Sequence, residues 1–454
     1  MSKIQGSGEE LRVPRRSLRA GIVLALALST LAVTQVVHAD DSPGWLSQPT
    51  MSGDWNGGRT ALKDAGITPY AAVLNEYARL FSGGKRRGGG VAQQYYFGAD
   101  FDMGKLAGWQ GGIIHVKFDD RSGPGTSARN IGNELEVQSN YGSGQNFRLS
   151  EFSYEQRFDG GKYIAKFGFL PVGDDYDNMV IPLCDFQNFS FCGHANPLFL
   201  NSGDSVYPDG HWGGDLRAFM RPDVYIEAGV WAVNNDYLKS NHGFDVSLKD
   251  SDGAIVPIEL GWRPQIGRDK LHGDYKLGVY YETSTAKDVA YPQINRHGRY
   301  GGYFMANQML VRFQPDTERG LIGFAEDVVG DTRTSPVPEF FNLGFIVQGP
   351  WAHRPTDYID FGVGHAQVNN RSRSVGVENS VDALVDAGRF DQIGETLEAY
   401  GQYGETDYEL GYGLRIAPWL LINPNVQYVV NPGAFSHTNV RNAWVFGTQL
   451  VVTF

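Results

Sequence analysis

The chain has 454 residues with 51 acidic against 39 basic side chains, and its formal net charge of −12 argues against nucleic acid as a partner. Its mean hydropathy of −0.32, and the lack of a run of about 18 apolar residues beyond the N-terminal segment, exclude a helical membrane protein. A transmembrane β-barrel stays compatible, because its strands need only about 9 to 11 residues that alternate between lipid and lumen. The 58 glycines and the 13% of aromatic residues also suit a barrel.

Residues 1–39 have the pattern of an export signal peptide, with several arginines, an apolar run and a small-residue cleavage site that ends at Ala39. The alternative, a transmembrane helix, would need a longer apolar core. We therefore expect a mature chain with a periplasmic N-terminal segment over residues 40–68 and a barrel domain over residues 69–454.

Period-two alternation, interrupted by clusters of Gly, Pro, Asp and Asn, divides the mature chain into about sixteen strands. We expect them at residues 69–82, 92–105, 109–120, 147–158, 162–170, 211–220, 224–234, 254–264, 274–285, 299–314, 319–329, 339–349, 357–368, 404–416, 419–430 and 442–454. Long polar connections at 121–146, 171–210, 235–253 and 369–403 alternate with short ones. This order predicts an all-β, antiparallel transmembrane β-barrel with short periplasmic turns and long extracellular loops, although the turn near 265–273 is long and the loop near 330–338 is short.

The alternation also assigns faces, because a lysine or arginine on the lipid face near the membrane centre would cost about 2 to 4 kcal/mol. The charged side chains should therefore face the lumen. The candidate pore-lining residues are Lys117, Asp119, Glu151, Glu155, Lys166, Glu227, Trp231, Glu259, Glu282 and Arg312, and the same pattern places Glu409 and Arg415 inward. In the first strand Glu76 and Arg79 fall on opposite faces unless a bulge shifts the register.

Two cysteines, Cys184 and Cys192, lie in the connection 171–210. We expect a disulfide, because an exported protein meets an oxidising compartment; two unpaired thiols are the alternative. A metal site is not expected, since the cysteines with His194 give at most three ligands at unusual spacing. No other cofactor motif is present.

A motif lies just before the first strand: Gly53-Asp54-Trp55-Asn56-Gly57-Gly58-Arg59-Thr60-Ala61-Leu62, then Asp64-Ala65-Gly66-Ile67. It resembles the opening G-D-W-G-G-x-R-x-x-L-x-x-x-G-I of the carbohydrate-selective porin family, the glucose porins of the OprB type, with Asn56 in place of one glycine. Residues 60–65 can form a short helix that Gly66 caps. The segment either anchors the N-terminus in the periplasmic mouth or contacts sugar. A second resemblance, to the family's penultimate hairpin, covers residues 408–433.

The resemblance implies a bacterial outer-membrane channel of about sixteen strands that lets small sugars diffuse passively. Its final strand, which ends at Phe454, looks like the strand that the barrel assembly machinery reads. The resemblance also implies that the protein lies in outer-membrane lipid and that, like many porins, it assembles into a homotrimer.

Several alternatives stay open at this point. The loop 171–210 either narrows the channel or caps the surface, the inward charges either contact solute or only brace the wall, and Trp231 either stacks on sugar or belongs to an interfacial aromatic belt. A general or small organic-acid channel is the second candidate function. A barrel enzyme or an adhesin is a third, but no G-x-S-x-G or H-E-x-x-H motif supports an enzyme.

Overall fold

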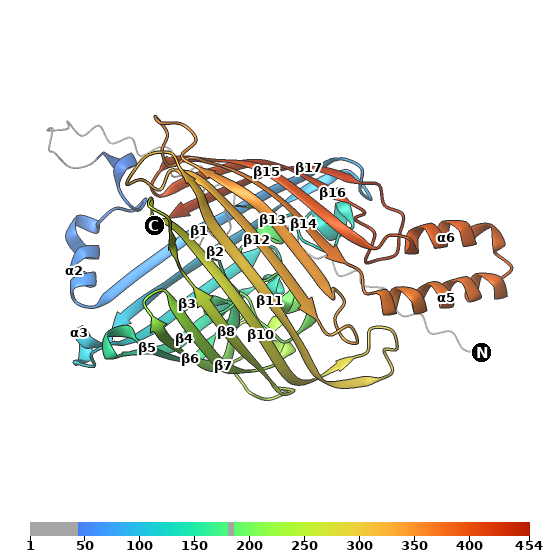
Figure 1. The fold of residues 1–454 in the computed structure, drawn as a ribbon, viewed down its shortest axis with the longest axis horizontal. Coiled ribbons are helices and arrows are strands. Elements are labelled where there is room, and N and C mark those ends of the chain that lie inside the picture. The colour runs from blue at the N-terminus through green and yellow to red at the C-terminus, as the bar shows by residue number, and fades with distance from the viewer. Residues whose placement is uncertain (1–43, 180–185) are drawn as a thin grey trace, which may run out of the picture. The chain divides into compact units, whose positions relative to one another are not determined.

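The wall consists of long antiparallel strands, each joined to the next along the chain (Figure 1). The computed structural model describes residues 44–179 and 186–454, so the signal peptide expected at 1–39 lies outside the described residues. The strands are β1 (Ile67–Ser82), β2 (Gly88–Asp102), β3 (Gly112–Ser122), β4 (Phe147–Phe158), β5 (Tyr163–Leu170), β6 (His211–Arg221), β7 (Val224–Ala232), β8 (Ala254–Trp262), β9 (Gln265–Ile266), β10 (Leu271–Lys287), β11 (Asn295–Arg312), β12 (Gly320–Gly330), β13 (Glu339–Gln348), β14 (Tyr358–Gln367), β15 (Gly404–Ala417), β16 (Leu420–Val430) and β17 (Ala443–Thr453).

The sheet closes on itself, because β1 pairs with β2 on one side and with β17 on the other. Setting aside the two-residue β9, which only extends the turn before β10, sixteen strands form the barrel. The predicted fold class is thus confirmed, and each of the sixteen predicted segments overlaps one wall strand. The short β9 hairpin also explains why the turn near residues 265–273 is longer than the others.

Long and short connections alternate around the barrel. The start of β1 and the end of β17 therefore both lie on the side of the short turns. The described helices are α2 (Gly58–Asp64), α3 (Met103–Ala107), α4 (Leu198–Asn201), α5 (Asn370–Asp386) and α6 (Ile393–Tyr400). Helices α5 and α6 extend beyond the ends of the strands, in the connection between β14 and β15 (Figure 1). In the described part of the chain, no helix is long and apolar enough to cross a membrane.

The side chains of β1 alternate between the lumen face and the outer face. Glu76 is fully buried on the lumen face, whereas Arg79 is exposed on the outer face. The bulge in β1 comes only after both residues, between Leu80 and Ser82. The two charges therefore do lie on opposite faces, and Arg79 is an arginine on the outer wall.

The N-terminal segment folds as the motif suggests. Helix α2 ends before Gly66, whose φ of +100° is the left-handed conformation that favours glycine at this position. The Arg59 guanidinium donates to the carbonyls of Gly53 (3.2 Å) and Pro69 (3.3 Å) and lies over the Trp55 ring at 4.4 Å. The motif thus ties the segment before β1 to the first residues of that strand. This contact supports the prediction that the motif anchors the N-terminal segment.

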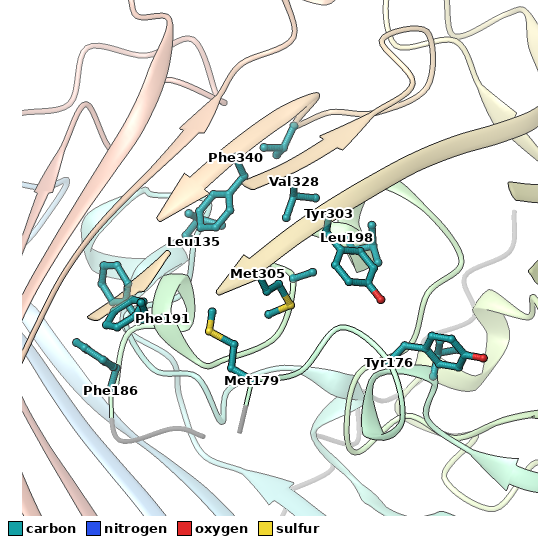
Figure 2. Close-up of a cluster of buried hydrophobic side chains, with 14 of the residues drawn as sticks. Leu135, Tyr176, Met179, Phe186, Phe191, Leu198, Tyr303, Met305, Val328 and Phe340 are labelled. Carbon is teal, nitrogen blue, oxygen red and sulfur yellow. The ribbon is translucent and has the colours of Figure 1, made fainter. Parts of the chain in front are cut away.

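A hydrophobic core occupies part of the lumen itself, between the connection 171–210 and the wall. Figure 2 shows Met179, Phe191 and Leu198 of this connection near Tyr303 and Met305 of β11. Further wall residues of the same cluster come from β7 to β14 and from β16. Apolar side chains on lumen faces are thereby removed from water, which holds the connection inside the barrel.

We expect Gly66→Ala to lower the unfolding temperature more than Gly160→Ala. Both glycines have positive φ, so alanine costs about 1 to 2 kcal/mol of backbone strain at either position. A Cβ at Gly66 would in addition lie 2.9 Å from the Lys105 Cβ, whereas nothing lies within 4 Å at Gly160. Thermal unfolding in detergent, followed by circular dichroism, measures both shifts. Equal shifts would show that the contact with α3 does not constrain Gly66.

Candidate functional site

Two loops enter the lumen, and each is bound to the wall through carboxylates. In the connection 171–210, the backbone N–H groups of Gln187 and Asn188 donate to Glu409 of β15 at 2.8 and 2.6 Å. The Gly203 N–H donates to Glu282 of β10 at 2.7 Å. Charged acceptors make such hydrogen bonds stronger than neutral ones. The described parts of this loop therefore fold into the barrel, which decides between the two predicted positions.

The second inward loop, residues 123–146, uses the same arrangement. Glu405 of β15 accepts from the N–H groups of Glu134 (2.9 Å) and Leu135 (3.0 Å). Glu76 of β1 accepts from the Asn140 N–H at 3.1 Å. The inward position of this loop could not be predicted, because nothing in its sequence pattern distinguishes it from the other long connections.

Three of the predicted pore-lining residues meet two acids of the loop 171–210. Lys166 lies 3.1 Å from both Glu151 and Asp175, measured between nitrogen and oxygen. Lys117 lies 3.7 Å from Glu151 and 3.5 Å from Asp174. These two lysines and three acids form a network along β3, β4 and β5 that fixes the loop, with one acid more than the lysines can balance.

Asp119 is fully buried beside this network. Its carboxylate accepts from the Gln94 side-chain amide at 2.7 Å and from the Tyr207 hydroxyl at 2.8 Å. The Lys117 ammonium lies 4.8 Å from the centre of the Tyr207 ring. Asp119 therefore acts through Gln94 and Tyr207, whose orientations it sets.

Two cavities lie between the inward loops and the wall. One of about 500 Å³ is lined mainly by the inward loops, and one of about 560 Å³ reaches the short turns near Pro418. The lining residues that both cavities share are Leu74, Gln94, His194 and Tyr207. We call these four side chains the neck, because they line both the cavity of about 500 Å³, the outer cavity, and the cavity of about 560 Å³, the inner cavity.

The neck carries no formal charge at neutral pH. Burial lowers the pKa of His194 to about 4, and the nearby Lys276 charge acts in the same direction, so its imidazole is neutral. Gln94 offers an amide, Tyr207 a phenol and Leu74 an apolar surface. This set can exchange hydrogen bonds with a neutral, hydroxyl-rich solute and contact its C–H groups.

The outer cavity contains acids whose charge depends on pH. Burial raises the pKa of Glu136 to about 7, and the neighbouring Glu134 carboxylate adds to the effect. Burial also raises the pKa of Glu134. The negative charge of this cavity therefore changes as the pH varies around neutrality.

The remaining predicted site residues lie away from the neck. Glu259 and Glu282 are fully buried, where Glu259 accepts from the hydroxyls of Tyr225 and Tyr303, both at 2.6 Å. Trp231 is 0% exposed and packs edge-on against Tyr176 at 5.5 Å, so its ring presents no surface to a solute or to lipid.

The last three predicted residues are held in pairs or at the rim. Glu155 accepts from Arg157 at 2.5 Å, and Glu227 accepts from Arg217 at 2.7 Å. Arg312 donates to the Asp269 carbonyl at 2.5 Å, in the turn before β10. Bracing of the wall describes these contacts better than solute binding.

Sequence reasoning missed all four neck residues. His194 and Tyr207 lie in an irregular loop, where alternation assigns no face. Gln94 follows Gln93 in β2, and this repeated pair hides which glutamine faces inward. Leu74 is apolar, so the rule that charged residues face the lumen does not select it.

Comparisons with known proteins agree with this geometry. A model of the family described as carbohydrate-selective porin, OprB family, matches residues 86–454. Porin B of Pseudomonas aeruginosa is 30% identical over 455 residues, which cover 94% of this chain and 96% of that protein. The high-pH structure of Pseudomonas putida OprB superimposes with a TM-score of 0.82 at 29% identity, covering 90% and 99% of the two chains. Salmonella typhi OmpF, with a TM-score of 0.51 at 8% identity over 86% and 99% of the chains, shares the fold alone.

We expect Glu409→Gln to loosen the loop 171–210. The amide keeps one acceptor oxygen but replaces the second with an NH₂ group that faces a backbone N–H donor, which costs about 2 kcal/mol. The unfolding temperature should fall by several degrees, and the open-channel current in planar bilayers should fluctuate more. Glu378→Gln, on the exposed side of α5, is the matched control and should change neither. Unchanged current noise in Glu409→Gln would contradict the tether.

We expect the channel to become more cation-selective as the pH rises from 6 to 8. With a pKa of about 7, Glu136 is mostly neutral below this range and mostly charged above it, so each step upward adds negative charge to the outer cavity. Reversal potentials in a KCl gradient measure the effect. Glu136→Gln should flatten the pH dependence, whereas Glu398→Gln, exposed on α6, should leave it intact. The same pH dependence in Glu136→Gln would exclude this carboxylate as its source.

Proposed function

This chain belongs to the carbohydrate-selective porin family OprB, channels of the bacterial outer membrane, and we propose that its neck admits glucose-like monosaccharides in preference to larger or charged solutes. The channel performs no reaction, so selectivity must arise from the size and chemistry of the narrowest part of the path. The proposal therefore concerns Leu74, Gln94, His194 and Tyr207.

One observation carries the proposal: four uncharged side chains line both of two cavities of about 500 and about 560 Å³. Around them, the nearby charges of β3 to β5 are paired with acids of the inward loop. A neutral sugar can thus replace its hydration water with the Gln94 amide and the Tyr207 hydroxyl, while an ion meets no opposite charge at the neck. The few contacts keep binding weak, as rapid passage requires.

A small organic acid is the second candidate solute, and Arg415 favours it. Arg415 lines the inner cavity, and among the described residues no carboxylate forms an ion pair with its guanidinium. An anion that passed the neck would find a cation there. This site would bind a carboxylate by bidentate hydrogen bonds.

Conductance of the purified protein in planar bilayers separates the two solutes. We expect glucose to reduce the current in a concentration-dependent way, and a disaccharide or a small organic acid to do so less. Tyr207→Phe removes a hydroxyl from the neck and should weaken the glucose block about fivefold, as one lost hydrogen bond of about 1 kcal/mol implies. Tyr154→Phe, which loses a hydroxyl bonded to Gln156 outside both cavities, is the control.

Arg415→Gln should leave the glucose block unchanged. If instead the organic acid blocks more strongly than glucose, and Arg415→Gln abolishes that block, the channel selects anions and the sugar proposal is wrong. Indifference to every solute would indicate a general diffusion pore.

We also propose that residues 1–39 are removed on export and that Cys184 pairs with Cys192. Cys192 is buried in the loop 171–210 beside the outer cavity, and Cys184 lies outside the described residues. A disulfide would close a short ring within the loop that positions His194 and Tyr207. Recognition of Phe454 by the barrel assembly machinery and assembly into a homotrimer stay predictions from the sequence.

A further inference from the structure

Six exposed basic side chains gather at the extracellular rim of β1, β2 and β17. They are Arg79, Lys85, Arg86, Arg87, Arg129 and Arg441, and we call them the basic rim. Backbone hydrogen bonds hold their segments together: the Gly84 N–H donates to the Arg441 carbonyl at 2.9 Å. The N–H groups of Lys85 and Arg86 both donate to the Asn130 carbonyl, at 2.8 and 3.0 Å.

The basic rim lacks compensating acids. The segments that supply it, residues 79–99, 121–133 and 431–454, contain no aspartate or glutamate. Among the described residues, none of the six side chains forms an ion pair, whereas the extracellular Arg296 and Arg333 pair with Asp288 and Asp331. In a chain with a net charge of −12, this is a local region of positive potential.

Arg79 places the basic rim against the lipid-facing wall. In the register of β1 and β17 it lies opposite Phe446, which is 43% exposed, and Trp444 and Phe81 on the same wall are exposed as well. On the β2 side its partner is Gly89, where a Cβ would lie only 3.1 Å from the Arg79 Cβ. The glycine therefore leaves room for an arginine beside apolar side chains, a costly position unless the guanidinium reaches an anion.

We propose that the basic rim binds the phosphate groups of the phosphorylated glycolipid that forms the outer leaflet. Its acyl chains would lie against Phe81, Trp444 and Phe446, and its phosphates would meet the arginines and Lys85. Guanidinium groups bind phosphate oxygens by paired, charge-assisted hydrogen bonds. The surface faces away from the lumen, so this binding is independent of the transported solute.

Titration of the full-length protein in detergent with fluorescently labelled lipid A tests the proposal. Lys85→Gln/Arg86→Gln/Arg87→Gln should weaken binding on the order of 100-fold, because each basic residue near an anionic lipid surface contributes about fivefold. Arg79→Gln alone should weaken it about fivefold. The control Lys162→Gln/Arg268→Gln/Lys270→Gln removes the same charge from exposed short turns and should bind as the unmodified protein does.

Dephosphorylated lipid A should bind the unmodified protein as weakly as intact lipid A binds the Lys85→Gln/Arg86→Gln/Arg87→Gln variant. Three results would overturn the proposal: equal binding by that variant and its control, equal affinity for the dephosphorylated lipid, or displacement of lipid A by an equal concentration of inorganic phosphate, which would make free phosphate the ligand. Single-channel conductance and heat-resistant migration of each variant show that the barrel is folded.

Discussion

The channel depends on wall carboxylates that accept hydrogen bonds from the backbone of the inward loops. A loop inside a barrel leaves the sheet and must find new partners for its peptide groups. Strand β15 supplies two of them: Glu405 binds the loop 123–146 and Glu409 binds the loop 171–210, while Asp407 between them accepts from the Ser190 hydroxyl. Acidic residues on the lumen face thus have a structural use.

The wall was predictable because its physics is local and repetitive. Lipid requires an apolar side chain at every second position, and closure requires all backbone groups to pair, so strand positions, turn lengths and faces follow from a period of two. For Glu76 and Arg79 the sequence left two arrangements open, and the structure places them on opposite faces because the bulge of β1 comes only after Leu80. Only small departures, such as β9 or the bulge after Leu80, arise from turn geometry that alternation does not encode.

The neck was not predictable in the same way. Charge selected Lys117, Glu151 and Lys166 correctly as lumen residues, but these charges neutralise acids of the loop and leave the neck to uncharged neighbours. The neck needs the loop 171–210 to fold back onto β1 and β2, a contact between residues more than 100 positions apart. Trp231 was predicted as a pore-lining residue for the opposite reason: its ring does face the lumen, but the loop 171–210 packs over it and buries it in the hydrophobic core.

The hydrophobic core within the barrel separates two properties that a simple pore would link. In an empty cylinder, the exclusion limit grows with the number of strands. Here the loop fills the lumen along β7 to β14, and the open path runs beside the remaining strands. Insertions, deletions or repacking within one loop can therefore retune which solutes pass, while the hydrogen-bonded wall and its lipid contacts stay the same. Proteins with this scaffold can therefore differ in the solutes that they admit while the barrel wall stays the same.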